Sequence, residues 1–445
     1  MSRNIYIRTF GCPLNKFDSL RIEGSLRYIG LKIVDNISES DLIIVNSCGV
    51  KKQTEDKVID YLKHIKSRYP GKKILLAGCL PKINPTRINR ENLCDAKFGP
   101  TEIGDLVRYV AKIYRVGIKP LIREADIHDH IPLKNSITYP LGVSSGCLDK
   151  CSFCGTRNAR GTVKSLDINT VKKIVVKLVR RGYKEILLTS TDLGAYGFDL
   201  KPRRNMVDLL REIASLEGDF IVRIGMANPR WIYKWLDEII EILQTTHKFY
   251  HFLHIPVQTG SDRLLEIMNR GHGTMEYIES VKRLRKELGN RFTIATDIIV
   301  GHPGESEADF EQTLELLKES RPDYVNISKF FPRPNTPAKY MKQLPTQVIK
   351  ERSREVSRLT DEIMLDRNRL WEDWTGHVLV NEYGKNGTMM ARNYAYKIFV
   401  LDSRLRLGDI VKVKFKYAHP TWIEADIVEV SYGDGGLRGF YPHIH

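Results

Sequence analysis

The chain has 445 residues, 42% of them hydrophobic, and a formal net charge of +16 with a pI near 9.4. At ~150 residues a domain, this length suggests about three domains that can each bury a core. No apolar run approaches the ~18 residues of a membrane span and the N-terminus lacks a signal-peptide core, so we expect a cytoplasmic protein. The charge favours a polyanionic partner, nucleic acid before a membrane surface, although many soluble proteins are simply basic.

Residues 1–116 repeat one pattern three times: a strand, then a cysteine beside a glycine, then a helix. The expected strands cover residues 5–8, 42–45 and 74–76. Strands that alternate with helices predict an open parallel α/β sheet, in which the loops after the strands share one edge. Cys12, Cys48 and Cys79 are therefore expected to meet there as three thiolate ligands. The alternative is three buried cysteines that only pack, as free cysteine often does.

The seven cysteines, without an expected secretion signal, favour metal or redox chemistry over disulfides. Cys94 follows no strand and is expected to bind nothing. The helix after Cys12 is expected to begin at Asp18 or Ser19, because both are common N-cap residues.

Residues 117–136 are polar, contain two prolines and are predicted to be a linker. In residues 137–368, six apolar runs are separated by helical patterns, at 139–143, 186–188, 221–224, 249–253, 293–300 and 324–328. This order predicts a partial (β/α)6 barrel within an overall α/β fold. Reactive groups of such barrels lie on loops at the C-terminal ends of the strands.

Three further cysteines, Cys147, Cys151 and Cys154, follow the first of these six runs at a CxxxCxxC spacing. A [4Fe–4S] cluster is normally held by four thiolates, so three ligands leave one iron open for a small molecule. The alternative is zinc, which prefers four ligands in CxxC pairs. Only Cys151 and Cys154 form such a pair, and this favours the iron–sulfur interpretation.

Residues 369–431 contain five short strand patterns, which predict a small β-barrel. Lys412, Lys414 and Lys416 alternate with apolar residues on one strand, and Trp422 follows. Basic side chains beside aromatic ones suit an RNA backbone with stacked bases, but a solvated strand face explains the pattern equally well. The glycine-rich tail, residues 432–445, is expected to lie loosely on the surface.

The cysteines of the central loop match the signature of radical S-adenosylmethionine (radical SAM) enzymes, and the whole chain resembles the methylthiotransferase branch of that family. The resemblance extends to the three N-terminal cysteine stretches and to residues 254–262, 299–305 and 331–337. The C-terminal barrel is similar to a TRAM domain, an RNA-binding module. Residues 46–56 look most like the archaeal and eukaryotic branch, which makes 2-methylthio-N6-threonylcarbamoyladenosine at position 37 of tRNAs.

The resemblance implies that the central cysteines bind a [4Fe–4S] cluster whose open iron chelates S-adenosylmethionine. One electron then cleaves the cofactor to a 5′-deoxyadenosyl radical, which abstracts the hydrogen from the adenine ring. It implies a second [4Fe–4S] cluster on Cys12, Cys48 and Cys79 that carries the sulfur, while a further S-adenosylmethionine supplies the methyl group. The implied partners are a tRNA anticodon loop, an unidentified electron donor and an unidentified sulfur source.

Barrel position suggests the residues that contact S-adenosylmethionine. The backbone of Phe153 could meet the adenine, and Thr191 and Asp192 could meet the amino group or ribose. Gln258 and Gly301 follow the fourth and fifth strands. Loop capping for Thr191 and Asp192 and a tight turn for Gly301 remain alternatives. Two other functions also remain open: a methylthiotransferase for isopentenyl-adenosine or a ribosomal protein, and a zinc-bearing RNA-binding protein.

Overall fold

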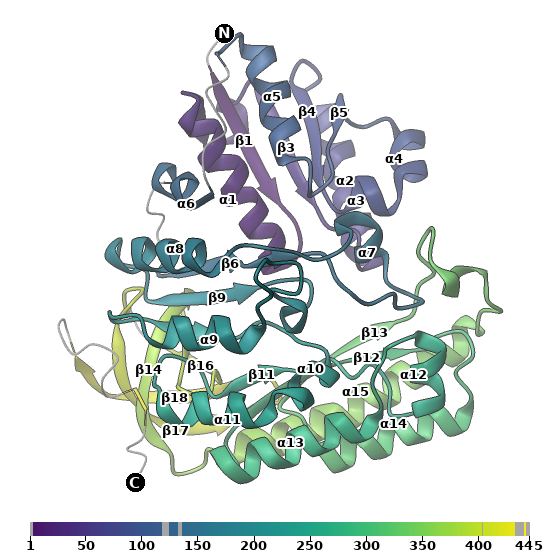
Figure 1. The fold of residues 1–445 in the computed structure, drawn as a ribbon, viewed down its shortest axis with the longest axis vertical. Helices are drawn as coiled ribbons and strands as arrows, with labels where there is room; N and C mark the ends of the chain where they lie inside the picture. The colour runs from purple at the N-terminus through teal and green to yellow at the C-terminus, as the bar shows by residue number, and fades with distance from the viewer. Residues whose placement is uncertain (1–2, 118–123, 132–135, 403, 432–439, 442–445) are drawn as a thin grey trace.

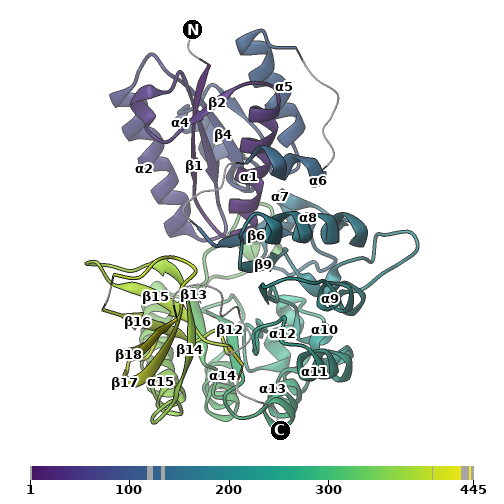
Figure 2. The same ribbon diagram turned by 90° about the vertical axis from the view of Figure 1, so that its left-hand side faces the viewer.

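The computed structural model describes residues 3–117, 124–131, 136–402, 404–431 and 440–441. Figure 1 shows a parallel sheet unit at the N-terminus, a central half-barrel below it, and a small β-barrel against the lower flank. Figure 2 shows the small barrel beside the half-barrel, with the N-terminal unit above. Among the described residues, no helix is both long and apolar enough to cross a bilayer.

The N-terminal sheet contains the three predicted strands and two edge strands that the sequence did not reveal. Its order is β2-β1-β3-β4-β5, all parallel. The strands are β1 (Asn4–Thr9), β2 (Lys32–Val34), β3 (Leu42–Ser47), β4 (Lys73–Gly78) and β5 (Ala96–Lys97). The helices are α1 (Pro13–Tyr28), α2 (Lys52–Arg68), α3 (Leu80–Ile83), α4 (Pro85–Glu91) and α5 (Ile103–Tyr114).

Both faces of this sheet are covered, because side chains alternate along a strand and every residue of β3 is buried. Leu42 and Ile44 pack with α1 and α5, whereas Ile43 and Val45 pack with α2, α3 and α4. The sheet is therefore the central layer of a three-layer unit, and the loops after β1, β3 and β4 open at one edge.

The N-cap of helix α1 lies six or seven residues earlier than expected. It starts at Pro13, with Cys12 as its N-cap residue. Proline suits the first helical position because its φ is already helical and its missing N–H has no partner there. Asp18 and Ser19 are buried inside the helix instead of capping it. The prediction of a cap at Asp18 or Ser19 was wrong, because Asp18 has a partner elsewhere in the chain.

All six predicted strands of the central half-barrel are present. They are β6 (Thr138–Gly142), β9 (Glu185–Thr189), β10 (Ile221–Arg223), β11 (Phe252–His254), β12 (Thr293–Val300) and β13 (Tyr324–Lys329). They form two parallel three-stranded sheets, β10-β9-β6 and β11-β12-β13, and a single bridge between Val222 and Phe249 links them. The outer helices are α8 (Ile168–Arg180), α9 (Met206–Ala214), α11 (Leu236–Thr245), α13 (Thr274–Leu288), α14 (Glu307–Ser320) and α15 (Thr346–Arg369).

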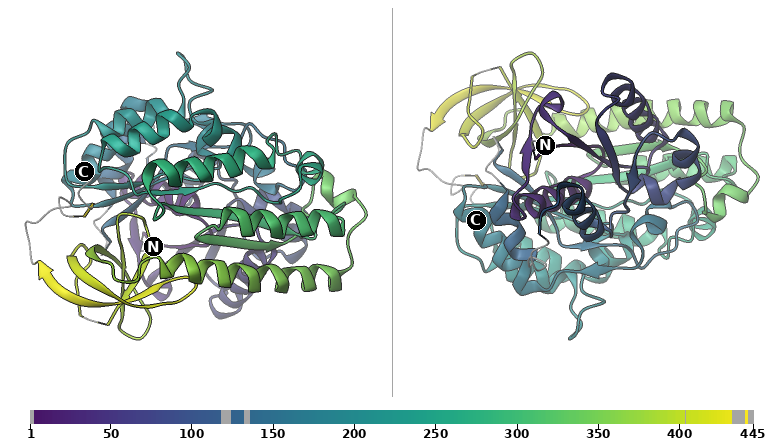
Figure 3. Two further views of the ribbon diagram at one scale, coloured as in Figure 1. Left: turned by 90° about the horizontal axis from the view of Figure 1, so that it is seen from below. Right: turned by 90° about the horizontal axis from the view of Figure 1, so that it is seen from above.

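Short elements fill the loops at the top of the half-barrel. They are β7 (Ser144–Ser145), α7 (Gly155–Arg160), β8 (Lys164–Ser165), α10 (Pro229–Lys234) and α12 (Asp262–Met268). Seen from below, the small barrel, in yellow, lies beside the last of the long green helices of the half-barrel (Figure 3). Helix α7 contacts α3 of the N-terminal unit, so the loop between β7 and α7 lies near that unit.

The predicted C-terminal β-barrel is closed, in the order β14-β15-β16-β18-β17. Its strands are β14 (Thr375–Tyr383), β15 (Met389–Arg392), β16 (Ile398–Leu401), β17 (Ile410–Ala418) and β18 (Ile423–Ser431). A buried ionic cluster fastens it to the half-barrel. Asp323 forms ion pairs with Arg285, Arg367 and Lys397, and Lys397 belongs to the small barrel. The predicted combination of fold types is confirmed.

The tail, which was expected to lie loosely on the surface, and the predicted linker both contain packed residues where the structure describes them. Phe440 and Tyr441 are buried, and the Tyr441 hydroxyl donates a hydrogen bond to the carbonyl of Phe249. Two large aromatic side chains thus anchor part of the tail that was expected to lie on the surface, and that expectation was wrong for these residues. In the predicted linker, His128 is buried and stacks on Phe17 of α1.

Candidate active site

The N-terminal cysteines follow β1, β3 and β4, which are neighbours in the sheet, so their loops meet at one edge. At Gly11 a Cβ would lie 2.6 Å from the Cβ of Cys48 and 3.3 Å from its sulfur. The loop that carries Cys12 therefore lies directly against Cys48. The Cys79 thiol lies 3.9 Å from the Oδ1 atom of Asn15, in the first turn of α1. The structure therefore places the three cysteine loops at one edge of the sheet, and their joint binding of a metal stays a prediction.

Burial makes this group costly to ionise without a metal. It raises the pKa of Cys79 to about 12 and that of Cys48 above its usual value, and the nearby Cys12 raises both further. Cys12 itself is exposed. Three neighbouring thiols, two buried and one open to solvent, form a site that a metal cluster would stabilise as thiolates. Cys94 packs against the α2 face of the sheet, away from this edge.

The central cysteines lie on the loop between β7 and α7. The Cys147 sulfur accepts a hydrogen bond from the Asp149 amide at 3.4 Å, and the Cys151 sulfur accepts one from Arg270 at 3.5 Å. Burial raises the pKa of Cys147 to about 12 and also raises that of Cys151, against the charge of Arg270. This site is thus also suited to thiolates only when a cation or a metal is present.

The two groups of cysteines face each other through a helix contact. Helix α3 begins directly after Cys79, and α7 begins directly after Cys154. A Cβ at Gly155 would lie 3.2 Å from Ile83, and Cys79, Ile83 and Ala159 form one buried cluster. Figure 1 shows α3 and α7 side by side between the upper sheet and the half-barrel.

Beside the central cysteines, a buried carboxylate has one oxygen atom without a hydrogen-bond partner. Asp192 is buried, and its Oδ1 atom accepts hydrogen bonds from the amides of Gly194 and Asn228. Its Oδ2 atom has no hydrogen-bond partner, and neither do the hydroxyls of Ser144 and Ser190. Burial, together with the charge of Asp149, raises the pKa of Asp192 to about 6. Such an unpaired carboxylate fits the ammonium group of an amino acid.

The side chains of Cys147, Asp149 and Asp192 place one ligand atom each within 4.8 Å of one another. Asp149 already pairs with Arg230 and accepts a hydrogen bond from Asn228 at 2.8 Å. Of the two carboxylates, Asp192 is therefore the one that is available to a ligand. This matches the predicted position of Asp192, and its contact with a cofactor stays a prediction.

The other predicted cofactor contacts have structural tasks in this arrangement. Thr191 accepts a hydrogen bond from the Gly146 amide at 3.2 Å and so holds the cysteine loop. Gly301 has a φ of +78°, and its amide donates to Glu305, which is the geometry of a tight turn. Gln258 is buried with a φ of +80° after β11. Phe153 lies edge-on to His302, with ring centroids 6.0 Å apart.

Acidic residues of the neighbouring strand lie opposite the predicted lysine face of the small barrel. Lys412 and Lys414 pair in register with Glu429 and Asp426 of β18, and Lys416 forms an ion pair with Glu424. Spacing along one strand could not reveal the charges of its neighbour. Beyond these pairs, Trp422 stacks on His419 with ring centroids 3.7 Å apart, and Tyr417 is 60% exposed. Of these aromatic residues only Tyr417 is exposed, and RNA contact by this hairpin or by the lysines stays a prediction.

Sequence reasoning missed three buried arginines around the cysteines. Arg160 pairs with Asp18, and Arg270 donates to Cys151. Arg333 donates to the carbonyl of Val50 at 2.9 Å, next to the Cys48 loop, and to Glu55. Arg333 lies inside one of the stretches that carry the family resemblance, which is a signal that could have found it. Arg160 and Asp18 are 142 positions apart, so no local pattern links them.

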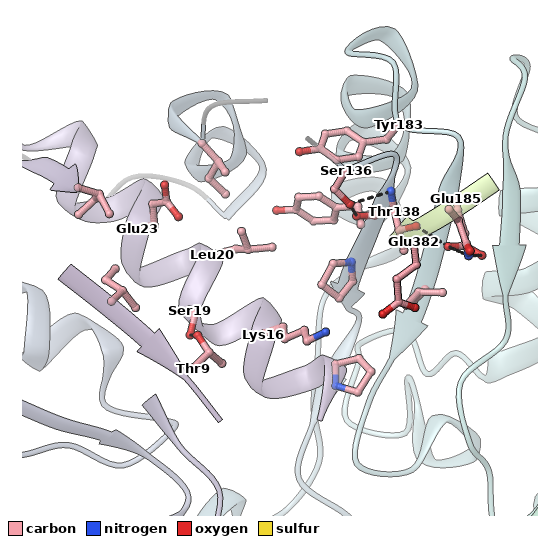
Figure 4. A pocket seen from close by; sticks show the side chains of 18 of the residues that line it. Thr9, Lys16, Ser19, Leu20, Glu23, Ser136, Thr138, Tyr183, Glu185 and Glu382 are labelled. Carbon is pink, nitrogen blue, oxygen red and sulfur yellow. Dashed lines mark hydrogen bonds between the residues drawn. The ribbon is translucent and has the colours of Figure 1, made fainter. Parts of the chain in front are cut away.

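A pocket of about 570 Å³ lies where the N-terminal unit, the β6 edge and the small barrel meet (Figure 4). Lys16 points into it from α1, while Thr138, Glu185 and Glu382 line the opposite side. None of the cysteines lines it, but Pro13 at the start of α1 does. The pocket therefore opens beside the loop of Cys12 without containing the cysteines.

Comparisons with known proteins agree with this site. The sequence profile of the radical SAM superfamily matches residues 141–317, and that of Uncharacterized protein family UPF0004 matches residues 4–99. The fold is shared with a solved radical S-adenosylmethionine methyltransferase, TsrM, from Kitasatospora setae with cobalamin and a [4Fe-4S] cluster bound. The TM-score is 0.55 at 12% identity, over 76% of this chain and 77% of that one. The half-barrel and its three-cysteine loop define a radical SAM enzyme, a class that uses S-adenosylmethionine and a [4Fe–4S] cluster.

Curated relatives narrow this class. The chain is 38% identical over 421 residues to a probable threonylcarbamoyladenosine tRNA methylthiotransferase of Archaeoglobus fulgidus, covering 93% of this chain and 96% of the relative. It is 32% identical over 444 residues to a tRNA-2-methylthio-N(6)-dimethylallyladenosine synthase of Aquifex aeolicus, covering 97% and 100%. The chain belongs to the family of threonylcarbamoyladenosine tRNA methylthiotransferases.

Proposed function

We propose that this enzyme converts N6-threonylcarbamoyladenosine at position 37 of tRNA to its 2-methylthio derivative. The observation that carries the proposal is the pair of three-cysteine sites that face each other across the contact of α3 with α7. One site suits radical formation and the other suits delivery of sulfur. Neither requires an acid–base pair, because the C–H bond to be replaced is not acidic.

The central site would hold its cluster through Cys147, Cys151 and Cys154. When bound, the cluster and S-adenosylmethionine supply the one-electron chemistry that removes a hydrogen atom from an unactivated carbon. The chain would orient the cofactor: the free oxygen of Asp192 would accept a hydrogen bond from its amino group, and Thr191 holds the cysteine loop through the Gly146 amide. Arg270 supplies a positive charge to the Cys151 sulfur.

The N-terminal site would hold a second [4Fe–4S] cluster through Cys12, Cys48 and Cys79. Two observations support it: the three loops converge at one sheet edge, and Cys12 alone of the three is exposed. An exposed ligand leaves one side of the cluster accessible to a sulfur atom and to substrate. A zinc ion would require a fourth ligand.

The tRNA would contact all three parts of the chain. The pocket beside Cys12 is lined by α1, β6 and the small barrel, and Lys16 points into it (Figure 4). The aromatic hairpin of Tyr417, His419 and Trp422 offers a stacking surface for an unpaired base. A cytoplasmic location, as expected from the sequence, fits this substrate and stays a prediction.

The test is mass spectrometry of nucleosides from tRNA incubated with anaerobically reconstituted protein, S-adenosylmethionine and a reductant. Substrates are matched tRNAs that carry threonylcarbamoyladenosine, isopentenyl-adenosine or unmodified adenosine at position 37. We expect the methylthio product only from the first. Product from the isopentenyl substrate alone would support the alternative suggested by the Aquifex aeolicus relative. No product from any tRNA would contradict the proposal and favour a protein substrate.

A further inference from the structure

Arg160 connects the two cysteine sites. It is the last residue of α7, the helix that begins after Cys154, and it is 3% exposed. Its Nη2 atom donates to Oδ2 of Asp18 at 2.6 Å and to Oδ1 of Asn15 at 3.1 Å. Both partners belong to α1, the helix that begins after Cys12. Its Nη1 atom donates to the hydroxyl of Ser145 at 3.1 Å, two residues before Cys147.

The same side chain therefore joins both groups of cysteines. Asn15 completes the link, because its Oδ1 atom, which accepts from Arg160, also lies 3.9 Å from the Cys79 sulfur. Its Nδ2 atom donates to the carbonyl of Phe10 at 2.8 Å, in the strand-end loop before Cys12. A displacement of Arg160 would thus move the loop of Cys12 and the surroundings of Cys79 together.

Stability alone does not account for a charged pair at this place. Arg160 and Asp18 are both almost fully buried, and taking two charges out of water offsets much of their attraction. A well-packed apolar pair of similar volume is often as stable or more stable. Burial raises the pKa of Asp18, and Arg160 opposes that rise. The pair has electrostatic consequences for its neighbours that an apolar pair would not have.

Those neighbours are the N-terminal thiols. The Arg160 guanidinium and the Cys79 sulfur lie on the same oxygen atom of Asn15, at 3.1 Å and 3.9 Å. In a water-poor interior, the interaction between charges is several-fold stronger than at the surface. A cluster with three thiolate ligands would therefore experience the charge of Arg160, together with that of Arg333 beside the Cys48 loop.

We propose that Arg160 is a positioning residue that fixes the two cysteine sites relative to each other and raises the reduction potential of the N-terminal cluster. The proposal rests on the proposed function, because it assumes a cluster on Cys12, Cys48 and Cys79. Reduction potentials of iron–sulfur clusters depend on nearby charge, hydrogen bonds and burial. A buried cation favours the more negative, reduced state, and Asp18 partly cancels that effect.

Two substitutions separate charge from packing, because they predict shifts of opposite sign. Arg160→Met keeps much of the side-chain volume and removes the positive charge, so the potential should become more negative. Asp18→Asn keeps the shape and leaves Arg160 uncompensated, so the potential should become more positive. We expect about a tenfold change in the ratio of reduced to oxidised cluster at fixed potential, which is about 59 mV for one electron.

The measurement is a redox titration followed by electron paramagnetic resonance, on the full chain with Cys147, Cys151 and Cys154 replaced by alanine. This background leaves the N-terminal site as the only predicted cluster. The matched control is Arg367→Met, another buried arginine, which pairs with Asp323 next to the small barrel. It should lower the melting temperature without moving the potential. Arg160→Lys keeps the charge and should keep a potential close to that of the parent.

The outcomes test the second cluster and the role of Arg160 separately. Fewer than about four irons in the triple-alanine background would contradict the second cluster itself, whatever Arg160 does. Four irons with an unchanged potential in Arg160→Met would overturn the electrostatic role. Shifts of the same sign in Arg160→Met and Asp18→Asn would also overturn it, because loosened packing would then explain both. If Arg160→Met fails to fold, Asp18→Asn and Arg160→Lys still decide the sign.

Discussion

The chain supplies three cysteines to each of the two sites in opposite ways. The central site takes its cysteines from one loop of eight residues, Cys147 to Cys154, whereas the N-terminal site collects Cys12, Cys48 and Cys79 from three strands. Each has a buried arginine nearby, Arg270 or Arg160. A local loop can hold its metal site almost alone, but a site assembled from three strands depends on the whole sheet. The second site should therefore be the more sensitive to changes in packing.

The largest expected effect separates the two sites by function. Replacing any central cysteine by alanine should abolish both cleavage of S-adenosylmethionine and formation of the methylthio product. Replacing Cys12, Cys48 or Cys79 should abolish the product but leave reductive cleavage of S-adenosylmethionine. Liquid chromatography of 5′-deoxyadenosine and of tRNA nucleosides measures the two separately. Loss of cleavage in the N-terminal variants would contradict a division of labour between the sites.

A backbone substitution tests the dependence of the second site on the sheet. Gly11→Ala places a Cβ within 2.6 Å of the Cys48 Cβ, at a φ of +117° that side chains rarely adopt. The loop must shift, so we expect iron to fall from about eight to about four per chain. Gly30→Ala is the control, since it has a φ of +86° but no atom within 4 Å. Equal iron loss in both variants would point to general strain instead.

Asp192→Asn should weaken the binding of S-adenosylmethionine without changing either set of cysteine ligands. It removes the charge of the unpaired oxygen, and a charge-assisted hydrogen bond contributes about 1.5–3 kcal/mol. The KM for S-adenosylmethionine should rise by about 10- to 100-fold, at unchanged iron content. Asp199→Asn, an acid that caps the Ser165 amide in another loop, is the control. An unchanged KM would remove Asp192 from the cofactor site.

The smallest expected effect concerns RNA. Because Lys414 lies opposite Asp426, Lys414→Ala should change the Kd for tRNA by less than about twofold. Trp422→Ala removes a stacking surface, for which about 1–3 kcal/mol per base is typical. Filter binding at two salt concentrations measures both. A large, strongly salt-dependent loss in Lys414→Ala alone would restore the lysine row as the phosphate-binding face.

The fold could be predicted because its signals are local. The six apolar runs of the half-barrel and the five of the small barrel alternate with clear turns or helices, and all are present as strands. The cysteine positions at the strand ends were equally visible. Short edge strands such as β2 and β5 were not, because three or two residues leave no periodicity.

What could not be predicted depends on contacts between distant segments. Asp18 is a residue type that often caps helices. Only its pairing with Arg160 explains why it is buried inside the helix instead. Tyr441 is in a glycine-rich tail, but its ring fills a site formed near Phe249. The acids opposite Lys412, Lys414 and Lys416 come from the next strand. Each case requires the register or the packing of two elements, which one segment of sequence does not contain.

The central claim is that the chain holds two open clusters, and iron counting tests it most directly. Iron and sulfide should be measured after anaerobic reconstitution in the parent protein and in two triple-alanine variants, one for each site. We predict about eight irons in the parent and about four in each variant. About four irons in the parent, unchanged when Cys12, Cys48 and Cys79 become alanine, would contradict the account.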